Sequence, residues 1–172
     1  MGTGILIVLL SSLFANYKST VFVRFLDVSQ GDAIHIHDHG CDMLIDTGKP
    51  DNYDSIISYL EGSNTRQLDI LLITHYHSDH VGELNDIVSN LEVKIVYTNQ
   101  STELIEVETI LQEGDCFTCG NSKFQVLNAD NGSTNENNNS IVLYAVIGGV
   151  RYLFTGDIEQ GVESRILDTY DF

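Results

Sequence analysis

Three histidines and an aspartate lie within six consecutive positions of the heptapeptide THYHSDH, residues 74–80. Their imidazole and carboxylate groups suit Zn²⁺, or Mn²⁺ and Fe²⁺ where oxygen ligands are more numerous. Because the segment turns from a strand into a helix, we expect His75 and His77 to project together and Asp79 and His80 to face a neighbouring point. Such sites hold two metal ions about 3.5–4 Å apart, bridged by hydroxide. The alternative is a solvated loop in which Asp79 caps the helix.

Two further acidic residues follow predicted strands. The histidine cluster ends LDILLIT, an apolar run typical of a strand buried on both faces. Asp46 follows CDMLI and Asp157 follows VRYLFTG, each near a glycine that lets the backbone turn sharply. Loops at the ends of buried strands are where a rigid scaffold holds functional groups. We therefore expect the three strand ends to converge on one site.

The hydrophobic pattern predicts one α/β domain without an internal linker, in which helices cover strands. Strands are expected over residues 20–26, 33–37, 41–46, 68–74, 93–99, 114–118, 122–128, 140–147 and 150–157. Helices are expected over residues 54–61, 81–91, 102–111 and from 158 onward.

The composition fits a single globular domain with an acidic surface. The chain has 172 residues, of which 42% are hydrophobic, and a formal net charge of -17. Only eight lysines and arginines are present, and they are scattered along the sequence. Such a surface repels nucleic acid unless bound metal or a local basic patch offsets it. Nothing in the composition therefore indicates stable binding of duplex DNA.

Residues 4–15, GILIVLLSSLFA, form an apolar run of the length of a signal-peptide core, too short to span a bilayer. No lysine or arginine precedes it, and it ends in a poor cleavage site. The alternatives are an export signal, the tail of a membrane helix from a longer protein, and a buried first strand. We separate residues 1–18 from a domain at 19–172. The first two alternatives predict an extracytoplasmic, secreted or membrane-associated protein.

The three cysteines suggest no cofactor of their own. Cys116 and Cys119 have C-x-x-C spacing, but a zinc knuckle needs a second pair of ligands. A thioredoxin-like pair would open a helix, whereas this pair lies in a predicted hairpin. We expect ordinary strand and turn cysteines, bridged if the protein is exported.

A second group of histidines, His35, His37 and His39, alternates along a predicted strand and its following turn. His35 and His37 therefore share one face of the strand. With no acid cluster beside them, we expect a solvated strand face.

The H-x-H-x-D-H string after an apolar strand resembles the signature of the metallo-β-lactamase superfamily. The segments FLDVSQGDAIHI, MLIDTG, ITHYHSDHVGEL, NNNSIVLYA and YLFTGDIE follow the order seen in the hydrolase domain of ComEC-type competence proteins and their free-standing relatives. The resemblance covers about residues 21–167. It implies an αββα sandwich that is incomplete at its C-terminal end, so that residues 19–172 form its N-terminal two-thirds.

The resemblance also implies roles for the cluster. His75 and His77 would serve one metal ion, Asp79 and His80 the other, and Asp157 would bridge both. Asp79 and Asp157 would then orient the attacking hydroxide and relay its proton.

Other residues are implied around the ligands. Asp46 would orient a ligand histidine, and Asp27, Gln30 and Asp32 match the family's opening motif near the site. Ser29 stands where that motif has glycine.

The second half of the chain departs from the superfamily pattern. Glu83 replaces a common glycine, and no histidine follows His80, although superfamily enzymes often use one before the bridging aspartate and another after it. Asn138, Asn139 or Ser140 would line the pocket instead, or belong to a plain polar loop. A missing C-terminal segment or a membrane-channel partner would then complete the site.

The implied function is metal-dependent hydrolysis through two divalent ions, Zn²⁺ first and Mn²⁺ or Fe²⁺ as alternatives. The resemblance suggests a phosphodiester substrate, such as one strand of incoming DNA. Hydrolysis of a small-molecule ester, thioester or lactam needs less positive field and remains an alternative. A third is a truncated or decayed relative that binds metal weakly or packs against a protein partner.

Overall fold

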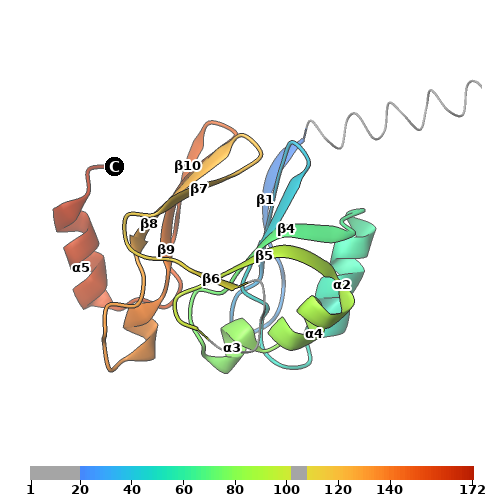
Figure 1. The fold of residues 1–172 in the computed structure, drawn as a ribbon, viewed down its shortest axis with the longest axis horizontal. Coiled ribbons are helices and arrows are strands. Elements are labelled where there is room, and N and C mark those ends of the chain that lie inside the picture. The colour runs from blue at the N-terminus through green and yellow to red at the C-terminus, as the bar shows by residue number, and fades with distance from the viewer. Residues whose placement is uncertain (1–19, 102–107) are drawn as a thin grey trace, which may run out of the picture.

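The computed structural model describes residues 20–101 and 108–172 of the chain. The apolar segment at residues 1–18 and most of the helix expected over 102–111 lie outside these ranges. Two β-sheets stack face to face, with helices on their outer sides (Figure 1). Within the described ranges, no helix has the length and apolar character needed to cross a bilayer.

The first sheet has six strands in the order β1-β2-β3-β4-β5-β6. The first three are antiparallel, and β3 to β6 pair in parallel. Parallel pairing brings the carboxyl ends of β3, β4 and β5 to one edge of the sheet. The strands are β1 Val21–Phe25, β2 Ile34–Asp38, β3 Cys41–Ile45, β4 Gln67–Leu72, β5 Glu92–Thr98 and β6 Glu108–Ile110.

The second sheet is antiparallel, in the order β10-β9-β8-β7. Its strands are β7 Cys116–Cys119, β8 Ser122–Asn128, β9 Val142–Ile147 and β10 Val150–Phe154. The helices are α2 Tyr53–Gly62, α3 Ser78–Val81, α4 Leu84–Asn90 and α5 Gln160–Thr169, with a 3₁₀ turn at Glu136–Asn139.

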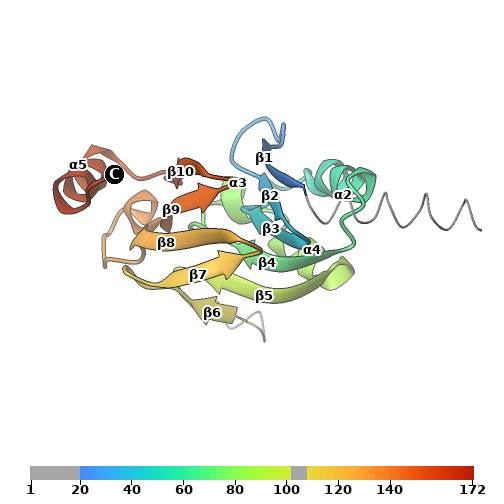
Figure 2. The same cartoon turned by 90° about the horizontal axis from the view of Figure 1, so that it is seen from above.

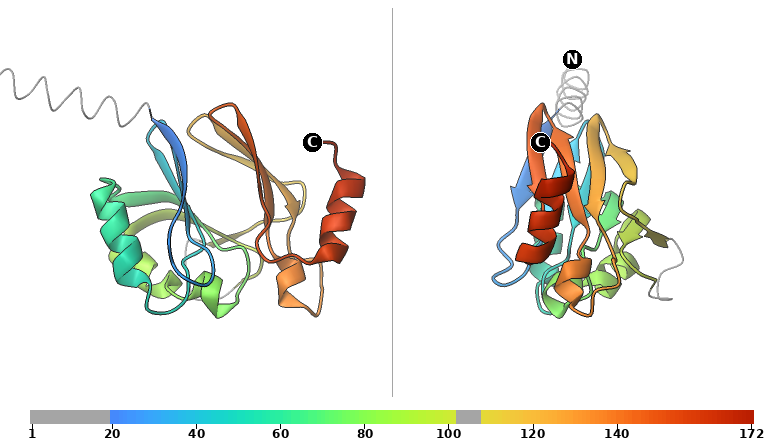
Figure 3. Two further views of the ribbon diagram at one scale, coloured as in Figure 1. Left: turned by 180° about the vertical axis from the view of Figure 1, so that it is seen from behind. Right: turned by 90° about the vertical axis from the view of Figure 1, so that its left-hand side faces the viewer.

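Apolar side chains fill three layers. Between the sheets, Ile36 and Met43 share a buried cluster with Phe124 and Leu143. Helices α2 and α4 cover the outer face of the first sheet, and α5 packs on the second sheet (Figures 2 and 3). This arrangement is an αββα sandwich, as the sequence predicted.

The predicted strands and most predicted helices are confirmed, but the region around residue 110 was predicted wrongly. Glu108–Ile110 is a strand that pairs in parallel with Val96–Thr98, although a helix was expected there. The cause is non-local, because β5 offers an open edge to which these residues add. The helix expected over 81–91 is also divided, since α3 ends at Val81 and α4 begins at Leu84.

A disulfide joins the two sheets. Cys41, at the start of β3, pairs with Cys119 at the end of β7, across 78 residues of sequence. Cys116 is free and exposed, so the C-x-x-C residues do not pair with each other.

The prediction that His35 and His37 lie on a solvated face was wrong. Both are fully buried, because Tyr59 of α2 packs on His35 and Phe22 of β1 stacks on His37. His35 Nε2 and His37 Nδ1 lie 2.9 and 2.8 Å from the same oxygen, Oδ1 of Asp42. The Tyr59 hydroxyl of α2 lies 3.0 Å from His35 Nδ1. An acid therefore does accompany these histidines, from the neighbouring strand, while His39 is exposed in the turn.

Candidate metal centre

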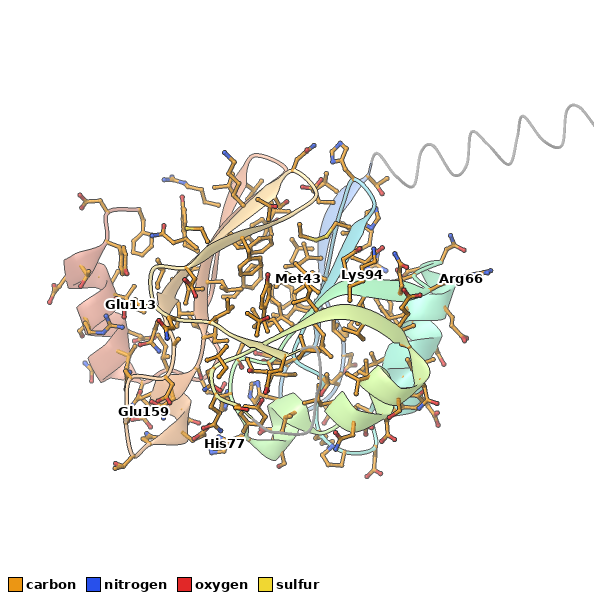
Figure 4. All side chains as sticks on the ribbon, in the orientation of Figure 1. Met43, Arg66, His77, Lys94, Glu113 and Glu159 are labelled. Carbon is orange, nitrogen blue, oxygen red and sulfur yellow. A yellow bond between two sulfur atoms is a disulfide. The ribbon has the colours of Figure 1, made fainter. Side chains whose placement is uncertain are left out.

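The histidines of THYHSDH gather where β4 ends. After Leu72 the chain turns, and α3 begins at Ser78. The ring centroids of His75 and His80 lie 4.3 Å apart, and those of His75 and His77 4.8 Å apart. His75 and His80 are buried, whereas His77 is exposed at the lower edge of the molecule in Figure 4. The motif therefore forms one compact imidazole cluster at the surface.

The second sheet adds a carboxylate to this cluster. Asp157 follows β10, and its Oδ1 lies 3.4 Å from His80 Nε2. One ligand atom each of His75, His80 and Asp157 lies within 4.8 Å of the others, and the same holds for Asp32, Asp46 and His80. The structure thus brings together residues of both sheets that are far apart in sequence.

Two of the residues assigned by resemblance, His77 and Asp79, fall outside these sets within the part of the chain that the structure describes. His77 lies beside them, with its Nδ1 3.1 Å from His75 Nε2. Asp79 accepts a hydrogen bond from Gln30 Nε2 at 3.2 Å. Their assignment as metal ligands stays a prediction.

Asp46 binds the ring nitrogen of His80 that points away from Asp157. Its buried carboxylate accepts hydrogen bonds from the Thr74 backbone N–H at 2.7 Å and the Thr74 hydroxyl at 2.8 Å. The second oxygen also lies 2.8 Å from His80 Nδ1. With Nδ1 bound to Asp46, His80 Nε2 faces Asp157. A carboxylate that fixes the tautomer and direction of a histidine is typical of metal sites.

The loops that carry these residues are tied to each other. The Thr47 backbone N–H donates to the His80 carbonyl at 2.7 Å, and the Glu83 N–H donates to the Thr47 hydroxyl at 3.2 Å. The buried Glu83 carboxylate accepts from the backbone N–H groups of Asp51, at 2.5 Å, and Asn52, at 3.1 Å. Sequence analysis assigned no role to Thr47, and it noted Glu83 only as a departure from the family pattern.

The opening motif contributes one acid near His80. Asp32 is half-buried beside His80, whereas Asp27 is exposed and accepts from the Ser29 backbone N–H. Ser29 has a φ of 67°, which explains why glycine is expected at this position. A Cβ added at the next residue but one, Gly31, would lie 1.8 Å from the Asp79 carbonyl oxygen, so this loop lies directly against the histidine motif.

The asparagine-rich loop supports the site from the second sheet. The Ser140 hydroxyl accepts from the Asp157 backbone N–H at 3.3 Å. Asn138 Oδ1 accepts from the Glu159 N–H, and the Asn139 side chain binds the backbone of Ser133 in its own loop. Ser140 therefore positions Asp157, while Asn138 and Asn139 stabilise the loop.

The two buried histidines titrate in opposite directions. Burial, together with the neighbouring His80, lowers the pKa of His75 to about 4. Burial also acts to lower the pKa of His80, but Asp46, Asp157 and Asp32 together raise it to about 9. Burial raises the pKa of Asp32. At neutral pH His75 is thus a neutral imidazole, and a proton on His80 neutralises part of the carboxylate charge.

These donors fit a divalent cation. Imidazole nitrogens and carboxylate oxygens converge here. The negative charge of the carboxylates exceeds the positive charge of one protonated histidine. In addition, Nδ1 of His80 is already bound to the carboxylate of Asp46. A cation would replace the proton on His80, as metal binding generally does at histidine ligands.

Comparison with known proteins agrees with this geometry. A family model described as "Metallo-beta-lactamase superfamily" matches residues 26–104. The ComE operon protein 3 of Bacillus subtilis is 27% identical over 86% of this chain and 23% of its own length. A hydroxyacylglutathione hydrolase of Bdellovibrio bacteriovorus is 29% identical over 67% of this chain and 49% of its own length. The chain thus spans half or less of the length of these relatives.

Solved structures show the same fold. A subclass B3 metallo-beta-lactamase of Bradyrhizobium japonicum superimposes with a TM-score of 0.63 at 14% identity, over 88% of this chain and 70% of that one. A metallo-beta-lactamase of Cronobacter sakazakii gives a TM-score of 0.65 at 13% identity, over 87% and 68%. The chain therefore has the metallo-β-lactamase fold, and over residues 26–104 its sequence is similar to that of the metallo-β-lactamase superfamily.

Proposed function

We propose that this chain is a metal-dependent hydrolase of phosphodiester bonds that acts through two divalent ions. The observation that carries the proposal is the convergence of His75, His80 and Asp157 from two sheets within 4.8 Å. The phosphodiester class is inferred from the resemblance to ComEC-type competence proteins, and the 27% identity to ComE operon protein 3 over 86% of the chain agrees with that resemblance.

Each candidate ligand is assigned to one or both of the two ions. His75 and His77 would hold one ion, Asp79 and His80 the other, and Asp157 both, with Zn²⁺ preferred over Mn²⁺ or Fe²⁺ by the imidazole content. Bound ions of this kind lower the pKa of water and polarise the bond under attack.

The protein supplies orientation and proton transfer. Asp46 keeps His80 Nε2 directed at the site, and Ser140 holds the backbone of Asp157. A Cβ added at Gly156 would lie 2.9 Å from the Cβ of Ser140, so glycine at this position lets the backbone before Asp157 pass close to Ser140. We propose that the Asp157 carboxylate, which is partly exposed to solvent, takes a proton from the attacking water and passes it to solvent.

Metal content and hydrolysis of bis(p-nitrophenyl) phosphate test the proposal together. Purified protein should bind about two divalent ions and cleave the ester, and Asp157→Ala should reduce kcat by about 100-fold or more. Asp86→Ala is the matched control, because Asp86 is an exposed aspartate of α4, away from the cluster. Binding of well under one ion, with Asp157→Ala without effect, would support a decayed, non-catalytic relative instead.

Thioester hydrolysis is the second candidate. Three hydroxyacylglutathione hydrolases match between 51% and 67% of the chain, and an acidic site suits a substrate of low charge. An acylglutathione thioester in the same assay distinguishes the two. Cleavage of the thioester without cleavage of the phosphodiester would select the second candidate.

We also propose an extracytoplasmic location. The disulfide between Cys41 and Cys119 supports it, because such bonds persist mainly in oxidising compartments. Thiol labelling of protein from cell fractions, with and without reductant, tests this. Labelling of Cys41 in unreduced native protein would contradict it.

A further inference from the structure

Most lysines and arginines of the described residues lie away from the candidate metal centre. The end that carries the metal centre, called the site end, consists of the loops at 26–33, 46–52, 73–83, 98–101, 129–141 and 155–160. These loops meet because β3, β4 and β5 end here and because β2 and β9, which run antiparallel to their neighbours, begin here.

Acidic side chains cover the site end. Besides the carboxylates of the candidate metal centre, four of the six loops carry a further exposed acid: Asp27, Asp51, Asp130 and Glu159. Within these described loops, Lys49 is the one lysine or arginine.

Most other cations lie at the opposite end. Arg66 precedes β4, and Lys94 lies near the start of β5, where its Nζ is 2.6 Å from Asp69 Oδ1. Lys123 and Arg151 both pair with Val146, beside the turn between β9 and β10. Figure 4 shows Arg66 and Lys94 well away from His77 and Glu159.

The remaining two arginines are engaged elsewhere. The Arg24 guanidinium lies over the rings of Phe22 and Tyr59, at 5.8 and 5.5 Å from their centroids. Arg165 is bound to Glu113 at 3.0 Å and to Asn128 Oδ1 at 2.7 Å. Neither is available to a ligand at the metal centre in this conformation.

The net charge of the site end determines which phosphodiesters can bind there. Two divalent ions would balance the carboxylates of Asp32, Asp46, Asp79 and Asp157, and would leave the exposed acids uncompensated. Proteins hold nucleic acid strands mainly through lysine and arginine contacts to successive phosphates. With metal bound, the site end would attract the phosphate at the scissile bond, but its exposed carboxylates would repel the neighbouring phosphates of a strand.

We infer that the site selects substrates of low negative charge, namely phosphodiesters with a single phosphate, over nucleic acid strands. The inference rests on the proposed hydrolase function, and it narrows the substrate from phosphodiesters in general to those with a single phosphate. The inference predicts that kcat/KM per bond falls as the strand becomes longer, and that added salt raises kcat/KM for the long strand again. Salt normally weakens the binding of nucleic acid to proteins, so the predicted salt dependence has the opposite sign.

The test compares a thymidine dinucleotide with an oligothymidylate of about 20 nucleotides, on metal-loaded protein at low and high salt. We expect kcat/KM per bond to be at least about threefold lower for the long strand at low salt, and the difference to shrink as salt screens the repulsion. Higher kcat/KM for the long strand, falling with salt, would overturn the inference.

Charge reversal supplies the matched pair of variants. Glu159→Lys places a cation at the site end. Glu61→Lys makes the same charge change at an exposed position of α2, away from the site end. Glu159→Lys should raise kcat/KM for the long strand at low salt by about threefold or more and leave the dinucleotide unchanged. An equal gain from Glu61→Lys would show a general charge effect and contradict selection at the site end.

Binding separates this inference from the proposed function. Fluorescence anisotropy with the same labelled strand needs no turnover, so it tests the inference even if no phosphodiester is cleaved. Wild-type protein should leave the strand unbound at micromolar concentrations, and Glu159→Lys should bind it more tightly. Tight, salt-sensitive binding by the wild type would overturn the inference, whereas absence of cleavage alone would count against the proposed function.

Discussion

The free energy of unfolding of the metal-free protein should pass through a maximum near pH 6.5. The pKa of His75 is lowered to about 4, so between pH 4 and 6.5 the unfolded chain binds a proton that the folded chain does not, and stability rises with pH. The pKa of His80 is raised to about 9. Between pH 6.5 and 9 the folded chain holds a proton that the unfolded chain has lost, so stability falls as pH rises.

The magnitude follows from the pKa values. Each differs from the ordinary histidine value by about 2.5 pH units, which corresponds to about 3 kcal/mol at most. The Asp157 side chain beside His80 is 42% exposed, so solvent screens part of this interaction and we expect a fall of about 2 kcal/mol. Urea unfolding of chelator-treated protein at pH 5, 6.5, 8 and 9 measures both limbs, because urea adds no ionic screening.

Two variants identify the source of the falling limb. His80→Asn should remove the loss of stability between pH 6.5 and 9, whereas His39→Asn, at an exposed turn position, should retain it. If wild-type stability continues to rise through this range, or falls equally in His80→Asn, then Asp46 does not hold a proton on His80 and the account of the site electrostatics is wrong.

Three further changes test the contacts around the site and core. Asp46→Asn should lower zinc affinity by about 10- to 100-fold in a competition titration, because His80 loses its orienting carboxylate; unchanged affinity would refute this role. Cys41→Ser should lower the free energy of unfolding by about 4–5 kcal/mol relative to oxidised wild type, because the opened bridge spans 78 residues, and Cys116→Ser should not. Asp42→Asn should cost about 3 kcal/mol in urea unfolding, because it removes the charged acceptor shared by two buried histidines; a loss below about 1 kcal/mol would show that the buried pair is dispensable.

Elements with a strong local pattern could be predicted from sequence, and elements that depend on a distant partner could not. Residues 122–128 and 142–147 alternate or run apolar between clear turns, and both are strands. Glu108–Ile110 has no such pattern, and its conformation depends on the parallel edge of β5. The bridge between Cys41 and Cys119 depends on the stacking of the sheets, which no spacing in the sequence encodes.

The convergence of the site residues was predictable for a topological reason. Asp46 and His75 follow neighbouring parallel strands, and such strand ends share an edge. The supporting hydrogen bonds were not predictable, because Thr74, Thr47 and Glu83 bind residues 28 to 36 positions away. Hydroxyl and backbone contacts of this kind leave no periodic signal in the sequence.

The two histidine clusters of this chain show why residue types alone do not define a metal centre. Each contains histidines with an aspartate, and each is largely buried. At His35 and His37 one oxygen of Asp42 lies between the two ring nitrogens, so the carboxylate occupies the position that a cation would need. At His80 the carboxylate of Asp46 lies behind the ring, on Nδ1, and Nε2 faces Asp157 at 3.4 Å. The placement of the aspartate therefore distinguishes a structural cluster from a candidate metal site, and that placement is set by strand pairing rather than by sequence spacing.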